Sequence, residues 1–82
     1  MGARELRAAF NEVAAPAATC VKALLEYDRR HSDTESQILY FSGSYADGTG
    51  FTIQSDRIRP GEDVNLVARA TAERLLQQKG SP

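Results

Sequence analysis

ILYFSGSYADGTGFTIQS, residues 38–55, is the stretch that decides the fold. Its first half is rich in aromatic and β-branched residues, and residues 51–55 alternate apolar and polar side chains, both of which are typical of β-strands. Asp47 and Gly48 lie between the two halves and provide turn chemistry. The stretch therefore predicts a β-hairpin, which we place at residues 37–56.

The positions of the aromatic residues select the turn of this hairpin. A two-residue Asp-Gly turn would split the aromatic side chains between the two faces of the sheet. A three-residue loop, 46–48, with its final glycine in the left-handed conformation, gathers them on one face. In this register Phe41 lies opposite Ile53. Phe51 then lies opposite Gly43, and an aromatic ring packs well over a glycine in a cross-strand pair.

Upstream of the hairpin, apolar residues recur with the spacing of an amphipathic helix. They are Leu6, Phe10, Val13, Ala17, Cys20 or Val21, and Leu24. Pro16 interrupts this stretch, and a proline inside a helix removes a backbone bond and clashes with the preceding turn. Because the apolar stripe stays in phase across the proline, we predict one helix over residues 3–30, kinked near Pro16. Two helices joined at that point are the alternative.

A second helix is predicted at residues 61–79. Glu62 and Asp63 supply an acidic first turn, and Lys79 and Gly80 supply a basic last turn and a left-handed cap. The chain of 82 residues is therefore expected to form a single α+β domain with the order helix, two-stranded hairpin, helix (αββα).

Composition narrows the classes of function. Ten basic and eleven acidic side chains alternate along the chain, whereas a general nucleic-acid binder relies on clustered Lys and Arg. A single cysteine excludes an intrachain disulfide. No apolar stretch approaches the ~20 residues that a membrane span needs. We therefore expect a cytoplasmic protein that does not act at a membrane.

The residue types that carry catalysis do not form a recognisable site. In the predicted helix Cys20 and His31 are ~16 Å apart along the axis, so we interpret them as a core cysteine and a helix-end histidine. The glycine-rich stretch 43–50 lacks the lysine and the following helix of a phosphate loop, so we interpret it as turn chemistry. The carboxylates do not have calcium-loop spacing, and one histidine cannot make a zinc site. We expect no enzymatic activity, no cofactor and no metal.

Exposed apolar residues indicate a contact surface. Ile38 and Tyr40 lie on the hairpin face opposite the aromatic one, and Leu66 points away from the apolar stripe of the second helix. Three such residues in so small a domain, one of them beside a strand edge, favour binding to another protein.

In the predicted fold, one chain lacks a neighbour for its first hairpin strand and cover for part of its first helix, which predicts a homodimer. Residues 38–41 are apolar on both faces, as in a central strand that needs a neighbour. A helix of ~40 Å would overshoot the hairpin and leave Leu6, Phe10 and Val13 without cover. We expect the first hairpin strands of two copies to pair near Tyr40, which would extend the sheet to four strands.

The leading hypothesis is a non-enzymatic protein-binding module, an inhibitor or an adaptor. The alternative is a dimeric nucleic-acid-associated regulator that uses a basic surface made of Arg29, Arg30, Arg57 and Arg59. The order helix, two strands, helix resembles the small head-completion proteins of tailed phages and short phage-encoded anti-defence inhibitors. The resemblance covers topology and no residue motif, so it implies a phage or mobile-element origin but assigns no residue a role.

Overall fold

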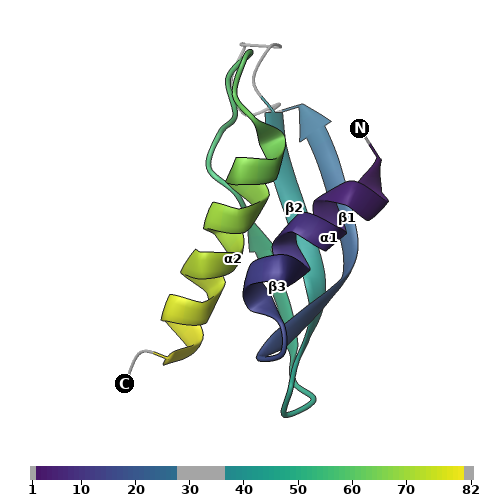
Figure 1. The fold of residues 1–82 in the computed structure, drawn as a ribbon, viewed down its shortest axis with the longest axis vertical. Helices are drawn as coiled ribbons and strands as arrows, with labels where there is room; N and C mark the ends of the chain where they lie inside the picture. The colour runs from purple at the N-terminus through teal and green to yellow at the C-terminus, as the bar shows by residue number, and fades with distance from the viewer. Residues whose placement is uncertain (1, 28–36, 81–82) are drawn as a thin grey trace.

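The computed structural model describes residues 2–27 and 37–80, and in these ranges it contains two helices and a three-stranded antiparallel sheet. In chain order the elements are α1 (Ala3–Ala14), β1 (Ala18–Tyr27), β2 (Gln37–Tyr45), β3 (Gly50–Gln54) and α2 (Val64–Gly80). The α+β class is confirmed. The predicted helix over 3–30 is wrong, because its second half is a strand; the observed order is helix, three strands, helix (Figure 1). The helix, two strands, helix order that carried the resemblance to phage proteins is therefore not the order observed.

Pro16 ends α1. The residue before a proline is restricted to extended backbone, and Ala15 has φ −69° and ψ 144°. Pro16 also has no N–H to continue the helical ladder. The helix therefore stops at Ala14, and the chain reverses into β1 within three residues, 15–17.

A β-bulge explains why β1 has the spacing of a helix. Cys20 pairs with Gly43 and Lys22 pairs with Ser42, so Val21 is an extra residue. The buried side chains on the two sides of the bulge are Cys20 and Ala23, three residues apart instead of two. That single irregular step imitates a helical repeat.

The hairpin of β2 and β3 confirms the predicted register. Phe41 pairs with Ile53, and Gly43 pairs with Phe51. The loop is 46–48, since the N–H of Tyr45 donates to the carbonyl of Thr49 at 2.7 Å. Its last residue, Gly48, has φ +92°, a left-handed conformation that glycine adopts without steric cost.

α2 begins at Val64, slightly later than predicted. The carboxylate of Asp63 accepts a hydrogen bond from the N–H of Asn65 at 2.9 Å, which is the geometry of a helix N-cap. The carboxylate of Glu62 instead accepts from the N–H of Arg59 at 3.0 Å and closes the turn before the helix.

The predicted four-stranded sheet made by two copies is wrong in its geometry. The sheet order is β1-β2-β3, so β2 is the central strand, as its apolar character indicated, but β1 of the same chain is its neighbour. Tyr40 pairs with Leu24 on one side and with Gln54 on the other. No edge of β2 remains at Tyr40 for a second copy.

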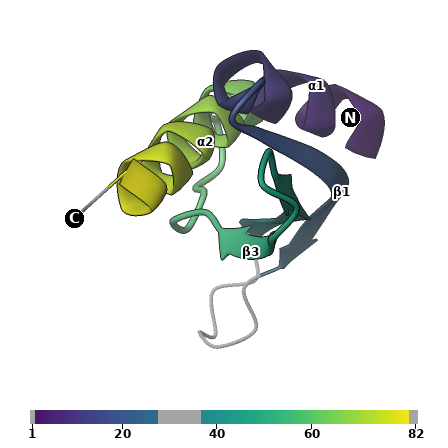
Figure 2. The same ribbon diagram turned by 90° about the horizontal axis from the view of Figure 1, so that it is seen from below.

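Both helices cover the same face of the sheet (Figure 2). The core beneath them is centred on Phe10, whose ring centroid lies 4.5 Å from that of Phe41 and 5.8 Å from that of Phe51. The prediction that Leu6, Phe10 and Val13 lack cover within one chain is wrong. Leu6 and Phe10 are 1% and 0% exposed, and Val13 packs against the same core, because the short α1 does not overshoot the sheet.

Candidate functional site

Around Leu24 and Tyr40 no described helix or strand covers the sheet face opposite the helices, which we call the open face. Its side chains follow from the strand alternation. Since successive residues of a strand point to opposite faces, the burial of Ala23, Phe41 and Ile53 in the core turns their neighbours outward. Two cross-strand rows result. One row is Lys22, Ser42 and Thr52, and the next is Leu24, Tyr40 and Gln54.

These rows surround a hollow of about 300 Å³. It is lined by Lys22, Leu24, Glu26, Tyr40, Phe41, Ser42 and Thr52. Leu24 is 43% exposed, and Tyr40 is half-buried beside it. The hollow therefore has an apolar centre with a cationic side chain, Lys22, and an anionic one, Glu26, two residues to either side of Leu24.

Side chains of α1 hold the bulged part of β1. The side-chain amide of Asn11 donates to the carbonyl of Cys20 at 3.1 Å and accepts from its N–H at 2.7 Å. Arg7 Nη1 donates to the carbonyl of Val21 at 3.3 Å. The outward backbone groups around the bulge are therefore bonded to the helix.

On β2, Gly43 lies opposite the bulge and allows the two strands to approach closely. A Cβ at Gly43 would overlap the carbonyl oxygen of Thr19 and lie 2.9 Å from the Cα of Cys20. The bulge brings the backbone of β1 too close to β2 for any side chain at this position.

Beyond the bulge, the set of β1 residues whose backbone N–H and C=O groups point away from β2 changes. In β2 the backbone groups of Gln37, Leu39 and Tyr45 form hydrogen bonds on the side that faces β3. In an antiparallel ladder the backbone N–H and C=O groups of successive residues point to opposite sides of the strand. The groups of Tyr40 and Ser42 therefore point toward β1, and those of their partners Leu24 and Lys22 point toward β2.

Ala23 and Leu25 consequently direct their N–H and C=O groups away from the sheet. Within residues 2–27 and 37–80 the structure shows no side-chain hydrogen bond to these groups and no backbone bond from a turn or loop. With the outward groups of Tyr27, they form the part of the β1 edge for which the described residues show no partner.

Cys20 is buried, as predicted, although it lies in a strand and not in a helix. Its Sγ donates to the carbonyl of Lys22 at 3.1 Å. Burial raises the pKa of the Cys20 thiol. His31 lies outside the described residues.

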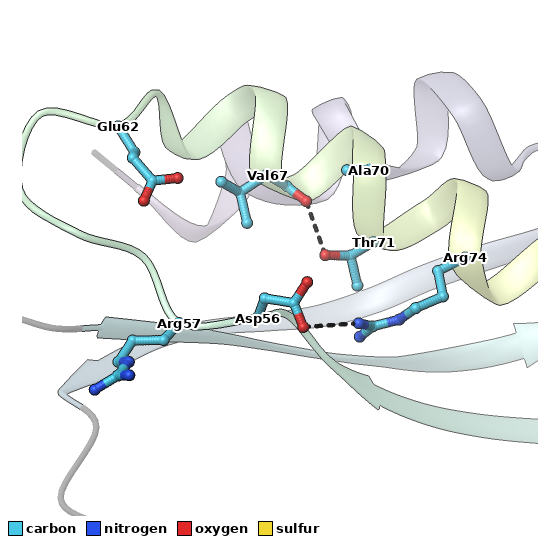
Figure 3. Close-up of a pocket in the computed structure, with 7 residues that line it drawn as sticks. All are labelled: Asp56, Arg57, Glu62, Val67, Ala70, Thr71 and Arg74. Atoms are coloured by element: carbon cyan, nitrogen blue, oxygen red, sulfur yellow. Dashed lines mark hydrogen bonds and ion pairs between the residues drawn. The ribbon is translucent and has the colours of Figure 1, made fainter. Parts of the chain in front are cut away.

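A second hollow, of about 200 Å³, lies between α2 and the segment that follows β3 (Figure 3). Two of its charged side chains, Arg74 and Asp56, pair with each other. Arg74 Nη1 lies 3.2 Å from Asp56 Oδ1, and Arg74 Nη2 donates to the carbonyl of Gln54. The side chain of Arg57 points away from the hollow (Figure 3).

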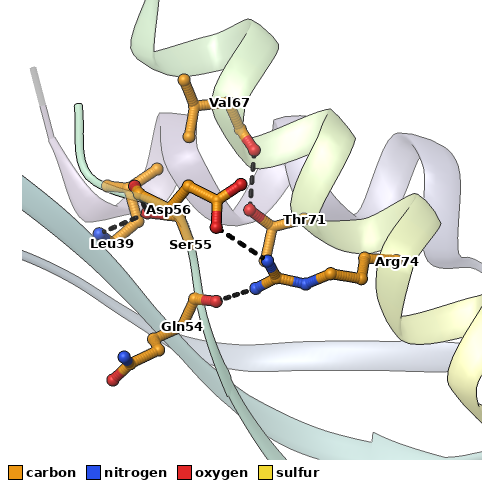
Figure 4. A network of polar contacts seen from close by, with 7 residues as sticks. All are labelled: Leu39, Gln54, Ser55, Asp56, Val67, Thr71 and Arg74. Atoms are coloured by element: carbon orange, nitrogen blue, oxygen red, sulfur yellow. Dashed lines mark hydrogen bonds and ion pairs between the residues drawn. The ribbon is translucent and has the colours of Figure 1, made fainter. Parts of the chain in front are cut away.

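The polar contacts around this second hollow hold neighbouring segments of the fold in place (Figure 4). The Ser55 hydroxyl accepts from the N–H of Leu39 at 3.0 Å and donates to the carbonyl of Asp56 at 2.8 Å. The Thr71 hydroxyl donates to the carbonyl of Val67 at 2.8 Å. The Ser55 bonds hold the residues after β3 against β2, the Thr71 bond lies within α2, and Arg74 alone of these side chains joins α2 to Gln54 and Asp56.

The structure separates the predicted contact residues. Tyr40 lies on the open face. Leu66 is 61% exposed on α2, apart from that face. Ile38 is only 2% exposed, so its predicted exposure is wrong.

Only half of the predicted basic surface lies in the part of the chain that the structure describes. Arg57 and Arg59 are exposed near the turn before α2. Arg29 and Arg30 lie outside the described residues.

Sequence reasoning missed Leu24, Lys22 and Glu26 as surface residues of a sheet. The signals that could have found them were Pro16 and the β-branched residues Thr19 and Val21 that follow it.

Among the described residues no group of three or more His, Cys, Asp and Glu side chains is placed to hold a metal ion. Neither helix, over the residues described, has the length and apolar character needed to cross a membrane. The chain matches no protein-family model, and comparison with curated proteins and with solved structures finds no similar protein.

Proposed function

We propose that this chain is a non-enzymatic protein-binding module, an inhibitor or an adaptor, and that it receives its protein partner on the open face of the sheet. The observation that supports this proposal is the apolar centre of that face. Leu24 is 43% exposed beside Tyr40, in a hollow large enough for an apolar side chain.

The rigidity of the face favours binding. The opposite face of the same sheet packs against both helices through fully buried side chains such as Phe10, Phe41 and Leu39. A surface held in this way loses little conformational freedom when a partner docks, which favours affinity. Tyrosine is also among the residues that most often dominate protein interfaces.

The residues that line the hollow indicate which side chains of a partner would fit it. An aromatic or aliphatic side chain would fill the centre, and Lys22, Glu26 and Thr52 would meet polar groups at the rim. Such an apolar centre with a polar rim is the common anatomy of protein interfaces.

Site-specific photo-crosslinking tests this proposal in extracts of the source cell. A photoreactive phenylalanine analogue is placed at Tyr40, at Thr52 and, as a control, at Leu66 on α2. Adducts with the same protein are expected from positions 40 and 52 and not from 66.

The crosslinked protein is then purified and its affinity measured by calorimetry. Tyr40→Ala is expected to weaken binding at least about tenfold, as for a central interface tyrosine. Leu66→Ser, which removes an apolar side chain of comparable exposure to Leu24, is expected to leave the affinity unchanged. Equal loss from both variants, or an adduct from position 66 alone, would contradict the proposal.

A further inference from the structure

We propose that two copies of this chain associate through the C-terminal half of β1, which pairs antiparallel with β1 of the second copy about a two-fold axis at Leu24. This inference concerns the edge of the sheet and does not depend on the function proposed for its face. It replaces the predicted pairing through Tyr40, which the central position of β2 excludes.

The backbone of β1 limits where a second strand can pair. At Cys20 and Val21 the outward groups already bond to Asn11 and Arg7. From Ala23 onward the outward groups are those of Ala23, Leu25 and Tyr27. A row of unpaired N–H and C=O groups of this kind is a template for another strand.

Only registers that bring outward groups face to face satisfy these hydrogen bonds. Pairing about Leu24 sets Ala23 opposite Leu25 of the second copy, and by symmetry Leu25 opposite Ala23. Both are then hydrogen-bonded pairs. Leu24 faces Leu24 of the second copy in a non-hydrogen-bonded pair, where side chains approach most closely.

The same register matches the charges on the open face. Lys22 lies opposite Glu26 of the second copy, and Glu26 lies opposite Lys22. Opposite charges at directly facing positions stabilise a strand pair, and apolar pairs do so too. The two Leu24 side chains meet at the axis with the flanks that point away from Tyr40, so the flank beside Tyr40 remains part of each hollow.

Two neighbouring registers also pair the outward backbone groups, but they do not bring Lys22 opposite Glu26. An axis at Ala23 sets Leu24 opposite Lys22, and an axis at Leu25 sets Leu24 opposite Glu26. Each places an apolar side chain against a charge. The charge pattern therefore selects the axis at Leu24 and a second copy of this chain as the occupant, because a two-fold axis makes the pattern complement itself.

Association of this kind would join the two three-stranded sheets into one of six strands. The two open faces would become continuous, with their hollows on either side of the axis. A partner with two matching sites could then engage both copies.

Charge reversal tests the register by sedimentation equilibrium over a range of concentrations. Lys22→Glu and Glu26→Lys each replace two attractive pairs with two repulsive ones, so each variant is expected to raise the dimer Kd about tenfold or more. The double variant Lys22→Glu with Glu26→Lys restores opposite charges and is expected to return the Kd to near its original value. All three variants change exposed side chains and are expected to keep the circular dichroism spectrum of the original chain.

Disulfide trapping tests the axis separately, in a chain that also carries Cys20→Ala. Leu24→Cys is expected to form a covalent dimer on mild oxidation, because facing Cα atoms in a non-hydrogen-bonded pair are ~4.5 Å apart, within disulfide range. Thr52→Cys is the matched control on β3 of the same face. At ~4.8 Å per strand its two copies would lie ~24 Å apart and cannot be bridged.

The proposal is overturned if the original chain remains a monomer at high micromolar concentration. It is also overturned if the double charge variant associates no better than either single one, or if Thr52→Cys is trapped as readily as Leu24→Cys.

Discussion

The side-chain amide of Asn11 in α1 bonds both backbone groups of Cys20 in β1, with N–H to Oδ1 at 2.7 Å and Nδ2 to carbonyl at 3.1 Å. An amide group offers a donor and an acceptor side by side, so it imitates the strand that is missing from this edge. The contact fixes α1 against the bulge across a connection of only three residues, 15–17.

Replacement of this amide is therefore expected to destabilise the fold. Asn11→Ala leaves the N–H and C=O of Cys20 without partners, which costs about 1–3 kcal/mol for groups of this kind. The matched control is Glu12→Ala, since Glu12 forms only an exposed ion pair with Arg69 and such pairs contribute below about 1 kcal/mol. Urea unfolding measures both, and an Asn11→Ala loss no larger than the Glu12→Ala loss would show that the amide does not hold the bulge.

Gly43 and Gly50 provide a paired test of the close approach between β1 and β2. A Cβ at Gly43 would overlap the backbone of Thr19, and neither strand can retreat without breaking the ladder. Gly43→Ala is expected to lower the unfolding free energy by about 3 kcal/mol, as for severe overpacking.

At Gly50 a Cβ would lie 3.7 Å from the carbonyl oxygen of Gly43, an ordinary contact. Gly50→Ala is therefore expected to change stability by less than about 1 kcal/mol. Thermal and urea unfolding of the two variants check the contrast, and equal effects would mean that the bulge does not impose the glycine.

Asp47 in the hairpin loop has an unusually acidic side chain. The Thr49 hydroxyl donates to its Oδ1 at 2.7 Å and the Thr49 N–H donates to the same oxygen at 3.0 Å. Lys79 Nζ lies 3.2 Å from its Oδ2. These bonds, with the Thr49 hydroxyl first, lower the pKa of Asp47 from 3.8 to about 2.

The depressed pKa sets the direction of the pH dependence. The contribution of Asp47 to stability is complete above its usual pKa of 3.8 and is lost as the pH falls from there through about 2. Carbon-13 NMR titration of the Asp47 carboxyl is expected to give a midpoint near 2. Thr49→Ala is expected to raise that midpoint more than Lys79→Ala does, and the reverse order would assign the main effect to the ion pair.

The hairpin could be predicted from the sequence down to its register because the information is local. Only one loop length puts the aromatic side chains on one face, and Gly48 supplies the left-handed residue which that loop needs. The second helix was equally accessible, since acidic residues before it and a basic last turn mark its ends.

β1 could not be predicted in the same way, because local preference and final structure disagree. Residues 22–26 read Lys, Ala, Leu, Leu, Glu, all strong helix formers, and the bulge at Val21 gives them a helical phase. Pairing with β2 overrides that preference, and pairing between distant residues leaves no local signal.

The candidate binding face was found only in part for the same reason. Tyr40 was identified because it belongs to the hairpin. Leu24, its neighbour across the sheet, was assigned to the apolar stripe of a helix. A surface made by two strands can be predicted only when both strands are recognised.

The two outer edges of the sheet differ, and that difference limits how large an assembly can grow. β3 has only five residues, Gly50–Gln54, against ten in β1, and Arg74 takes the outward carbonyl of Gln54. Fibres and crystalline stacks of sheets need a subunit that offers a compatible strand on both flanks, so that each addition creates the next site. If two copies pair through β1 as proposed, the flank that remains is the short and partly occupied β3, so raising the concentration is expected to fill pairs before it seeds filaments.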